Sequence, residues 1–583
     1  MKILLTAINA KYIHSNLAVY SLKAAAGEYA EQVEIAEFTI NNQADYILEE
    51  IYKRKPDVLM LSCYIWNLAM IEKVIREYHK LCPQVPIWIG GPEVSFEVET
   101  FLKEHKEVTG VMMGEGEATF CELCALYISK EKVTSFALSE IMGIAYRDTE
   151  GETETIQVNP WREILSMSKI PFCYDKMEDF SNRIIYYESS RGCPFSCSYC
   201  LSSIDKKLRF RDLALVKEEL KFFIDQKVPQ VKFVDRTFNC NHEHAMEIWK
   251  FIHENDNGVT NFHFEISADL LNEAELALME QMRPGLIQLE IGVQSTNTVT
   301  VQEIKRTMRL DRLKENVERI KAFGNIHQHL DLIAGLPYED YDTFKKSFDE
   351  IYELEPNQLQ MGFLKVLKGS YMYEHANEYE ILYHDTPPYE VLSTKWLSYD
   401  EILKMKRIEE MLEVYYNSGQ FEITMKLLKN YYESAFDMFQ RLGDFYEENR
   451  YFGVSHSRIK RCEILLDFVK QEWKTCPELE IRYDAVRQAL VFDLYYRENC
   501  KSRPIWAKDA ASFKSITHFY CKNGKMSHVE GFDYDFLAEG DSFAQKMDVV
   551  VWVMFSYDKR DVLTHQAKVE YIYPEVDMKK EEE

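Results

Sequence analysis

Short apolar runs alternate with amphipathic stretches through the first 128 residues of the chain. The apolar runs have the length of buried strands, and the stretches between them place apolar residues at helical spacing. The runs lie at residues 3–8, 33–40, 57–62, 86–90 and 108–113. This alternation predicts an α/β domain whose parallel, doubly wound sheet carries helices on both faces. Ligands of such sheets bind outside the carboxyl ends of the strands.

A second alternation follows between residues 181 and 378. Six apolar runs with helical patterns between them predict six βα units. The runs lie at residues 184–190, 231–235, 262–267, 287–293, 329–334 and 359–364. Six units predict a partial (β/α)6 version of the eight-stranded barrel, which carries its chemistry at the C-terminal ends of the strands.

The segment at residues 129–180 is predicted to be a connector that contains a hairpin. Two short apolar runs, at residues 143–147 and 154–158, flank the turn Asp148-Thr149-Glu150-Gly151, and such a turn between two runs is a hairpin signal. Residues 379–503 are predicted to be helical, with their many aromatic side chains forming a core.

Residues 504–583 are predicted to form a small hairpin-rich region, so that the C-terminal part is an α+β domain. One hairpin is expected from residues 517–521 and 528–532 across Asn523-Gly524, and a second from residues 549–555 and 567–572. The charged tail at residues 579–583 is expected to be disordered.

Three cysteines between the two alternating regions are the chemical centre of the sequence. Cys193, Cys197 and Cys200 have the spacing C-x3-C-x2-C and follow a hydrophobic strand directly. Three thiolates can hold three irons of a 4Fe-4S cluster and leave the fourth iron open to a small molecule. A zinc site normally needs four ligands in two pairs, and no second pair lies at a suitable distance. The cluster is therefore the favoured interpretation.

Composition narrows the classes of partner. The chain has 583 residues, a net charge of −27 and 13 cysteines. An acidic chain repels phosphate backbones, so long nucleic acids are unlikely substrates. The sparse, odd set of cysteines and the absence of a signal peptide lead us to expect reduced thiols and a cytoplasmic location. The sequence has no apolar run long enough for a transmembrane helix, so no membrane contact is expected.

The cysteine loop, with Tyr199 before its last cysteine, resembles that of the radical S-adenosylmethionine (SAM) enzymes. Polar residues at the ends of the predicted barrel strands are similar to those of the same family. The resemblance implies that residues 181–378 are a radical SAM core and that SAM binds at the open iron. It implies SAM contacts at Tyr199, Asp235, Glu265, Ser267, Glu290, Gln294 and Asp331. Ser267 stands where the family often has an arginine, so a guanidinium contact to the SAM carboxylate must come from elsewhere.

The strand tips of the first domain resemble those of the cobalamin-binding domain that precedes many radical SAM cores. The resemblance implies that residues 1–128 bind cobalamin, with the nucleotide tail near Ser62 and the Gly90-Gly91 pair. The candidate cobalamin residues are Asn9, His14, Ser62, Tyr64, Gly90, Gly91, Glu93, Gly114 and Glu115. The motif D-x-H-x-x-G is missing after the first strand. We therefore expect no histidine nitrogen on the cobalt, with His14 an ordinary loop residue.

The leading hypothesis is a cobalamin-dependent radical SAM enzyme that transfers a methyl group to an unactivated carbon of a small molecule or peptide. The resemblance implies SAM cleavage at the 4Fe-4S cluster, with electrons from a donor such as flavodoxin or ferredoxin. Three alternatives remain: a radical rearrangement or cyclisation, an enzyme like the tRNA methylthiotransferases, and a non-catalytic sensor of cobalamin and the cluster. The C-terminal region resembles an uncharacterised domain that follows some such cores, and it identifies no substrate.

Overall fold

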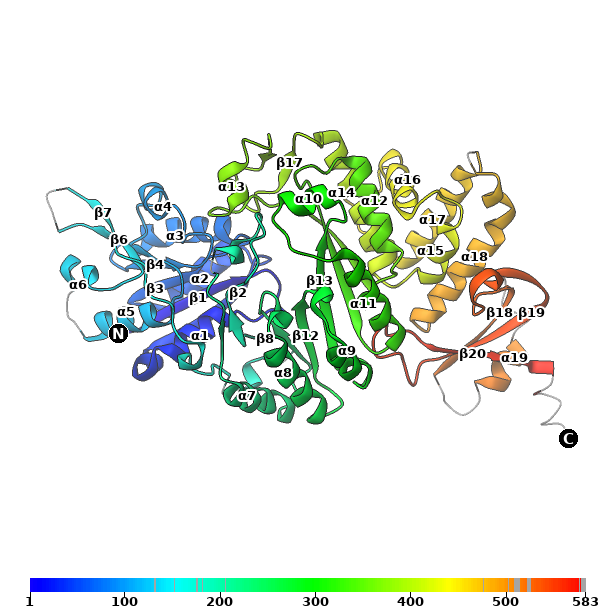
Figure 1. Ribbon diagram of the computed structural model, residues 1–583, viewed down its shortest axis with the longest axis horizontal. Coiled ribbons are helices and arrows are strands. Elements are labelled where there is room, and N and C mark those ends of the chain that lie inside the picture. The colour runs from blue at the N-terminus through cyan, green and yellow to red at the C-terminus, as the bar shows by residue number, and fades with distance from the viewer. Residues whose placement is uncertain are drawn as a thin grey trace.

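The computed structural model places three units in a row, and the chain runs through them from one end to the other (Figure 1). The described residues are 1–129, 133–150, 153–174, 177–180, 182–204, 206–474, 476–501, 503–507, 514–521, 526–575 and 577. Within them no helix is long and apolar enough to cross a membrane.

The first unit is a seven-stranded sheet with the order β2-β1-β3-β4-β5-β6-β7. The first five strands in sequence are parallel, as predicted, and β6 and β7 add antiparallel at the edge beside β5. The strands are β1 (Ile3–Asn9), β2 (Val33–Thr39), β3 (Val58–Ser62), β4 (Ile87–Gly90), β5 (Gly110–Met112), β6 (Ile144–Asp148) and β7 (Thr155–Val158). The two flanks of the predicted hairpin thus form the edge of this sheet, and residues 151–152 of its turn lie outside the described residues.

Helices cover both faces of this sheet. They are α1 (Leu17–Ala25), α2 (Ala44–Arg54), α3 (Leu68–Leu81), α4 (Val98–Glu104), α5 (Glu117–Ser129) and α6 (Ser135–Ser139). Ile47 and Val74 pack on one face with Leu59, whereas Val19 and Phe120 pack on the other. Strand β1 is buried along its whole length, as expected for a strand covered on both faces.

The second unit is a six-stranded parallel sheet in the order β15-β14-β13-β12-β11-β8, which confirms the predicted partial barrel. The strands are β8 (Ile185–Tyr187), β11 (Gln230–Phe233), β12 (Asn261–Ile266), β13 (Ile287–Gln294), β14 (His327–Ala334) and β15 (Gln358–Phe363). The helices are α7 (Leu213–Asp225), α8 (His242–Glu254), α9 (Glu273–Glu280), α10 (Thr298–Glu303), α11 (Leu310–Phe323) and α12 (Tyr341–Tyr352). A short antiparallel ribbon, β9 (Ser190–Arg191) with β10 (Arg209–Phe210), flanks the cysteine loop.

The third unit begins with helices that pack on the barrel. Phe436 contacts Phe348 of α12, and the apolar core of the barrel continues into this helical region. The elements are α13 (Tyr371–His375), β16 (Leu382–Tyr383), β17 (Val391–Ser393), α14 (Tyr399–Leu412), α15 (Glu422–Lys429), α16 (Ala435–Glu448), α17 (Arg458–Glu472), α18 (Glu478–Arg497), α19 (Lys514–Tyr520), β18 (Ser527–Asp535), β19 (Gln545–Ser556) and β20 (Lys568–Ile572). The aromatic stripe is core, as predicted, whereas the short ribbon β16–β17 was not foreseen.

One predicted hairpin of the C-terminal region is wrong. The segment at residues 517–521 lies in and just after helix α19 rather than in a strand. Strand β18 finds its antiparallel partner in β19, so its hydrogen bonds are satisfied without that segment. The second hairpin is confirmed, since β19 pairs with β20. Asn523-Gly524 and the tail at residues 579–583 lie outside the described residues.

Candidate active site

The three cysteines open onto one pocket at the carboxyl ends of the barrel strands. Cys193 and Cys197 are each 8% exposed, and Cys200 is half-buried. The residues that line this pocket are Cys193, Phe195, Cys197, Tyr199, Cys200, Ser202, Arg236, Thr237, Glu265, Ile266, Ser267, Glu290, Gly292, Gln294, Arg306, Thr307 and Asp331. Three sulfur ligands on one loop, with no fourth described cysteine in the lining, suit a cluster that keeps one iron open.

Six of the seven residues expected to contact SAM line this same pocket. They are Tyr199, Glu265, Ser267, Glu290, Gln294 and Asp331. Glu290 and Gln294 lie on β13, Asp331 lies on β14, and Glu265 lies on β12. Parallel strands bring these ends together because every βα unit starts again from the same side of the barrel.

Asp235 is not among the pocket-lining residues. Its carboxylate accepts hydrogen bonds from the Ser189 backbone amide at 2.9 Å, from the Ser189 hydroxyl at 2.7 Å and from the Ser190 hydroxyl at 2.5 Å. Burial raises the pKa of Asp235, and these three donors oppose that rise. The structure therefore places this side chain behind the pocket, where it holds the strand that leads into the cysteine loop.

Arg306 is a pocket residue that sequence reasoning missed. Its Nη1 lies 3.3 Å from the Tyr199 hydroxyl and 3.8 Å from the Cys197 sulfur, and its Nη2 donates to the Gly292 carbonyl. Its Nε and the Gln294 Oε1 are buried polar atoms with no hydrogen-bond partner among the described residues. A buried polar atom without a partner costs free energy, so both atoms mark places where a bound ligand would supply the missing partner. Arg306 belongs to no motif, and only the fold brings it to the cysteines.

Carboxylates dominate the pocket side opposite the cysteines. Burial raises the pKa of Glu265 to about 7, against the charge of Arg236. Burial alone would also raise the pKa of Glu290, but the hydrogen bond from His263 and the charge of Lys232 outweigh it and lower that pKa. Glu290 is thus held ionised, whereas Glu265 titrates near neutral pH.

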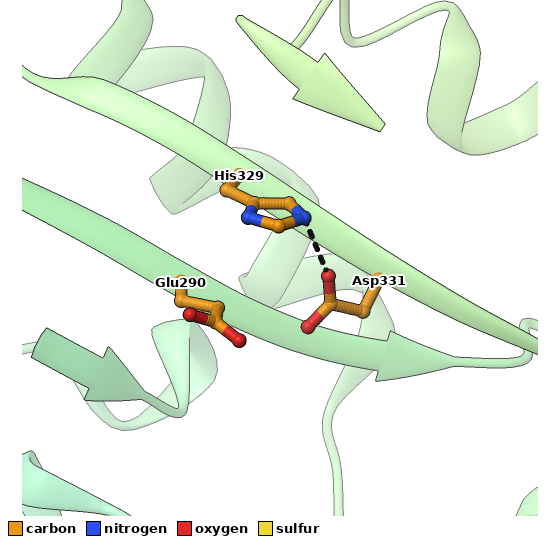
Figure 2. Close-up of side chains that lie close together, drawn as sticks. All are labelled: Glu290, His329 and Asp331. Atoms are coloured by element: carbon orange, nitrogen blue, oxygen red, sulfur yellow. Dashed lines mark ion pairs between the residues drawn. The ribbon is translucent and has the colours of Figure 1, made fainter. Parts of the chain in front are cut away.

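Glu290 lies close to His329 and Asp331 on the adjacent strand of the barrel wall (Figure 2). His329 Nε2 lies 2.9 Å from Asp331 Oδ1, while Lys232 Nζ and His263 Nε2 lie 2.8 and 3.0 Å from Glu290 Oε2. The ligand atoms of Glu290, His329 and Asp331 lie within 4.8 Å of one another, a spacing that a metal ion could use. Lys232 already faces Glu290, and His329 already faces Asp331, so each of the two carboxylates has a partner within the chain.

The nine candidate cobalamin residues lie at the carboxyl ends of β1, β3, β4 and β5, or in the turns that follow them. Several of their side chains face protein groups. His14 Nδ1 lies 2.6 Å from the hydroxyl of Tyr186 in the barrel. Glu93 accepts a hydrogen bond from Tyr389, and Glu115 is paired with Arg209. This edge of the sheet therefore faces the barrel.

The remaining polar candidates of β1 and β3 hold the turns in shape. Asn9 donates to the His14 carbonyl at 3.1 Å and to Glu37 Oε1 at 2.8 Å. Ser62 ends β3 and is buried. Both side chains lie at the edge that the resemblance assigns to cobalamin.

The glycines at this edge are required by packing within the chain. Gly91 has φ +127°, and a Cβ there would lie 2.2 Å from the Cys63 carbonyl oxygen. A Cβ on Gly90 would meet the side chain of Met112, and one on Gly114, which has φ +71°, would lie 3.0 Å from the Trp161 ring. The contact with Cys63 and the positive φ are together sufficient to require glycine at position 91.

Aromatic rings are a further feature of this edge, and of these Tyr64 was expected from the sequence whereas Trp66 and Trp161 were not. The rings of Tyr64 and Trp66 are stacked, with centroids 4.4 Å apart and an interplanar angle of 6°. Trp66 is 44% exposed and Trp161 is 53% exposed. Large exposed aromatic side chains beside a cofactor edge are available for an apolar ligand.

Three family models match successive parts of the chain. Residues 3–124 match the B12 binding domain, residues 187–351 match the radical SAM superfamily, and residues 377–557 match a protein of unknown function (DUF4080). The matches to the B12 binding domain and the radical SAM superfamily confirm the predicted cofactor set of cobalamin, SAM and a 4Fe-4S cluster.

Individual curated proteins are similar to this chain over more than half of its length. The chain is 27% identical over 350 residues to the cobalamin-dependent radical SAM methyltransferase TokK of Streptomyces tokunonensis. The aligned region covers 57% of this chain and 49% of TokK. The chain is also 21% identical over 340 residues to the anaerobic magnesium-protoporphyrin IX monomethyl ester cyclase of Rubrivivax gelatinosus. The aligned region covers 57% of this chain and 60% of the cyclase. The chain thus spans only about half the length of TokK.

A solved structure has a similar fold over most of the chain. The cobalamin-dependent SAM radical enzyme OxsB, with aqua-cobalamin bound, superposes with a TM-score of 0.56 at 15% identity and covers 84% of this chain and 80% of that one. The chain therefore carries a B12-binding domain followed by a radical SAM domain, and its fold is that of a cobalamin-dependent SAM radical enzyme over most of its length.

Proposed function

We propose that this protein is a cobalamin-dependent radical SAM enzyme that methylates an unactivated carbon of a small molecule or peptide. One observation carries the proposal: the three-cysteine pocket and the strand-end polar residues form one site beside the carboxyl edge of the B12-binding domain. When bound, the cluster and cobalamin supply the one-electron cleavage of SAM and the transfer of its methyl group. Electrons come from a donor such as flavodoxin or ferredoxin.

The cluster ligands in this proposal are Cys193, Cys197 and Cys200. Their burial excludes water from the sulfurs, and the Arg306 guanidinium places a positive charge 3.8 Å from the Cys197 sulfur. That charge favours the thiolate form, which is the form that binds iron.

SAM is held in this proposal by groups around the same pocket. Arg306 has the buried guanidinium that a SAM carboxylate requires, and it takes the role of the arginine missing at Ser267. Gln294, whose Oε1 lacks a partner among the described residues, supplies an acceptor. Glu265, Glu290 and Asp331 supply carboxylates for the amino and ribose hydroxyl groups, and Asp235 acts behind them as a positioning residue.

Cobalamin lies in this proposal along the carboxyl edge of the first sheet. The stacked Tyr64 and Trp66 rings offer an apolar surface for the corrin. His14 already shares a hydrogen bond with Tyr186, and burial and the charge of Lys11 lower its pKa. The lowered pKa keeps the ring neutral, so it does not itself oppose metal binding; the contact of Nδ1 with Tyr186 is what supports our expectation that no histidine nitrogen binds cobalt.

A second candidate function is a radical cyclisation. It is favoured by the similarity to the anaerobic magnesium-protoporphyrin IX monomethyl ester cyclase of Rubrivivax gelatinosus. A methylthiotransferase acting on tRNA is less well supported because the chain carries a net charge of −27. A non-catalytic sensor would have no need of the polar strand ends that line the pocket.

Product analysis separates these functions. The protein is reconstituted anaerobically with iron, sulfide and cobalamin, reduced, and supplied with SAM. Methyl transfer predicts 5′-deoxyadenosine and S-adenosylhomocysteine together, even as slow uncoupled products. Accumulation of 5′-deoxyadenosine alone, with the true substrate present, would favour cyclisation, and the absence of both products would favour the sensor.

A further inference from the structure

The cysteine loop is closed at its base by two arginines that face each other across a ribbon. Arg191 of β9 and Arg209 of β10 are register partners in that ribbon. Arg191 stands two residues before Cys193, and Arg209 follows Cys200. Contacts that fix these two side chains therefore also fix the two ends of the loop that carries the three thiols.

Both arginines bind carboxylates of the first domain. Arg209 holds Glu115 through two nitrogens, with distances of 2.6 and 3.1 Å. Arg191 Nη2 lies 2.6 Å from Glu117 Oε1, and its Nη1 lies 3.6 Å from Glu115 Oε2. Glu115 lies in the turn between β5 and α5, and Glu117 is the first residue of α5. We call these four residues the arginine bridge.

The arginine bridge is charged and largely shielded from water. The exposed fractions of its side chains lie between 8% and 21%, and Glu188 adds a third carboxylate 2.8 Å from Arg191 Nε. Burial raises the pKa of Glu117, but the charge and hydrogen bond of Arg191 outweigh it and lower that pKa. Both partners therefore stay ionised.

A network of this kind is a poor device for stability alone. The desolvation of buried charges consumes most of their mutual attraction, so apolar residues of similar volume would stabilise the interface at least as well. Two-pronged guanidinium–carboxylate pairs, in contrast, fix both distance and orientation. The chain uses one such pair, Arg209–Glu115, where the cysteine loop meets the first domain.

We infer that Arg191 and Arg209 are positioning residues that set how the cysteine loop stands relative to the B12-binding domain, and hence how the two cofactors face each other. The inference rests on the proposed function. Cleavage of SAM depends on the barrel pocket alone. Methyl transfer also requires the correct placement of the B12-binding domain relative to the barrel. The arginine bridge should therefore control the second process and leave the first intact.

Two conservative variants test the inference in the full-length protein loaded with cluster and cobalamin. Glu117→Gln removes the charge that Arg191 holds, and Arg209→Lys keeps the charge but loses the two-pronged geometry. Glu273→Gln is the matched control, because Glu273 forms a two-pronged pair with Arg319 at 2.7 and 2.8 Å on the exposed face of the same barrel.

We expect 5′-deoxyadenosine formation to stay at the wild-type level in Glu117→Gln and Arg209→Lys. The ratio of S-adenosylhomocysteine to 5′-deoxyadenosine should fall by about tenfold or more, since a small misplacement of reacting groups costs that much in rate. The second readout is the magnetic coupling between Co(II) and the reduced cluster in the EPR spectrum, which should change in both variants and not in Glu273→Gln.

Three outcomes would overturn the inference. One is an unchanged ratio and unchanged coupling in folded variants with full iron content, and another is an equal effect of Glu273→Gln. The third is the failure of both variants to fold or to bind iron, which would assign the arginine bridge to stability. If the wild-type protein forms no S-adenosylhomocysteine, methyl transfer itself fails, and the EPR coupling still decides on the bridge.

Discussion

The barrel and the first domain carry their candidate residues at the same kind of place, the carboxyl end of a parallel sheet, yet the two sets behave differently. In the barrel, the strand-end side chains of Glu265, Glu290 and Asp331 face one pocket. In the first domain, His14, Glu93 and Glu115 face side chains of other parts of the chain.

The difference follows from geometry. Strands of a curved barrel wall converge on the axis, so side chains at their ends meet whatever their identity. The carboxyl edge of an open sheet has no such axis, and its turns contact whatever domain covers them. Polar residues at strand ends are therefore a stronger sign of ligand contact in a barrel than in an open sheet.

The largest expected effect is on the cluster. Cys197→Ala should abolish the 4Fe-4S centre, because two thiolates leave two irons without protein ligands. Anaerobic reconstitution followed by iron and sulfide analysis measures this, and Cys193→Ala and Cys200→Ala should behave alike. Cys121→Ala in α5 is the control and should retain full iron. Undiminished iron in Cys197→Ala would show that the three cysteines of the barrel pocket do not hold the cluster.

The next largest effect concerns Arg306. Arg306→Gln should weaken SAM binding by about tenfold to a hundredfold, which is the range for a lost hydrogen bond to a charged group. Equilibrium binding of SAM to the reconstituted protein measures it. Arg309→Gln, at an exposed position nearby in sequence, should bind SAM like the wild type. Equal affinity of Arg306→Gln and wild type would remove Arg306 from the SAM site.

The raised pKa of Glu265 predicts a pH dependence of stability. A carboxyl whose folded pKa of about 7 lies above its ordinary value of 4.5 stabilises the folded state most fully below pH 4.5. That contribution is lost as the pH rises through about 7. Glu265→Gln cannot titrate. Its unfolding free energy minus that of the wild type should therefore rise by about 1–3 kcal/mol between pH 5.5 and pH 8, and the melting temperatures of the two proteins at each pH measure this. A constant difference across this range would show that Glu265 titrates normally.

The smallest expected effect tests the first domain. Tyr389→Phe removes the hydroxyl that donates to Glu93 and leaves a buried carboxylate with one partner fewer. We expect a loss of about 1–2 kcal/mol in unfolding free energy, measured by denaturant titration. Cobalamin affinity should stay unchanged if Glu93 serves the contact between domains. A marked fall in cobalamin affinity would instead show that Glu93 contributes to cobalamin binding.

Sequence reasoning predicted most of the fold because the relevant signals are local. All five parallel strands of the first sheet and all six of the barrel were expected from apolar runs. The failure at residues 517–521 occurred where a short segment with aromatic and β-branched residues fits a strand or a helix equally well. There the choice depended on which partner β18 found in the folded chain.

The sequence by itself determined the chemistry: three cysteines at C-x3-C-x2-C after a strand, and the order of strands and helices that places them. It determined these because a loop motif and a hydrophobic period are written in neighbouring residues. Only the tertiary structure decided that Arg306 joins the pocket, that Asp235 stands behind it, and that Glu115 meets Arg209. Those contacts join residues 46 to 107 positions apart, and no local pattern specifies which side chains packing will bring together.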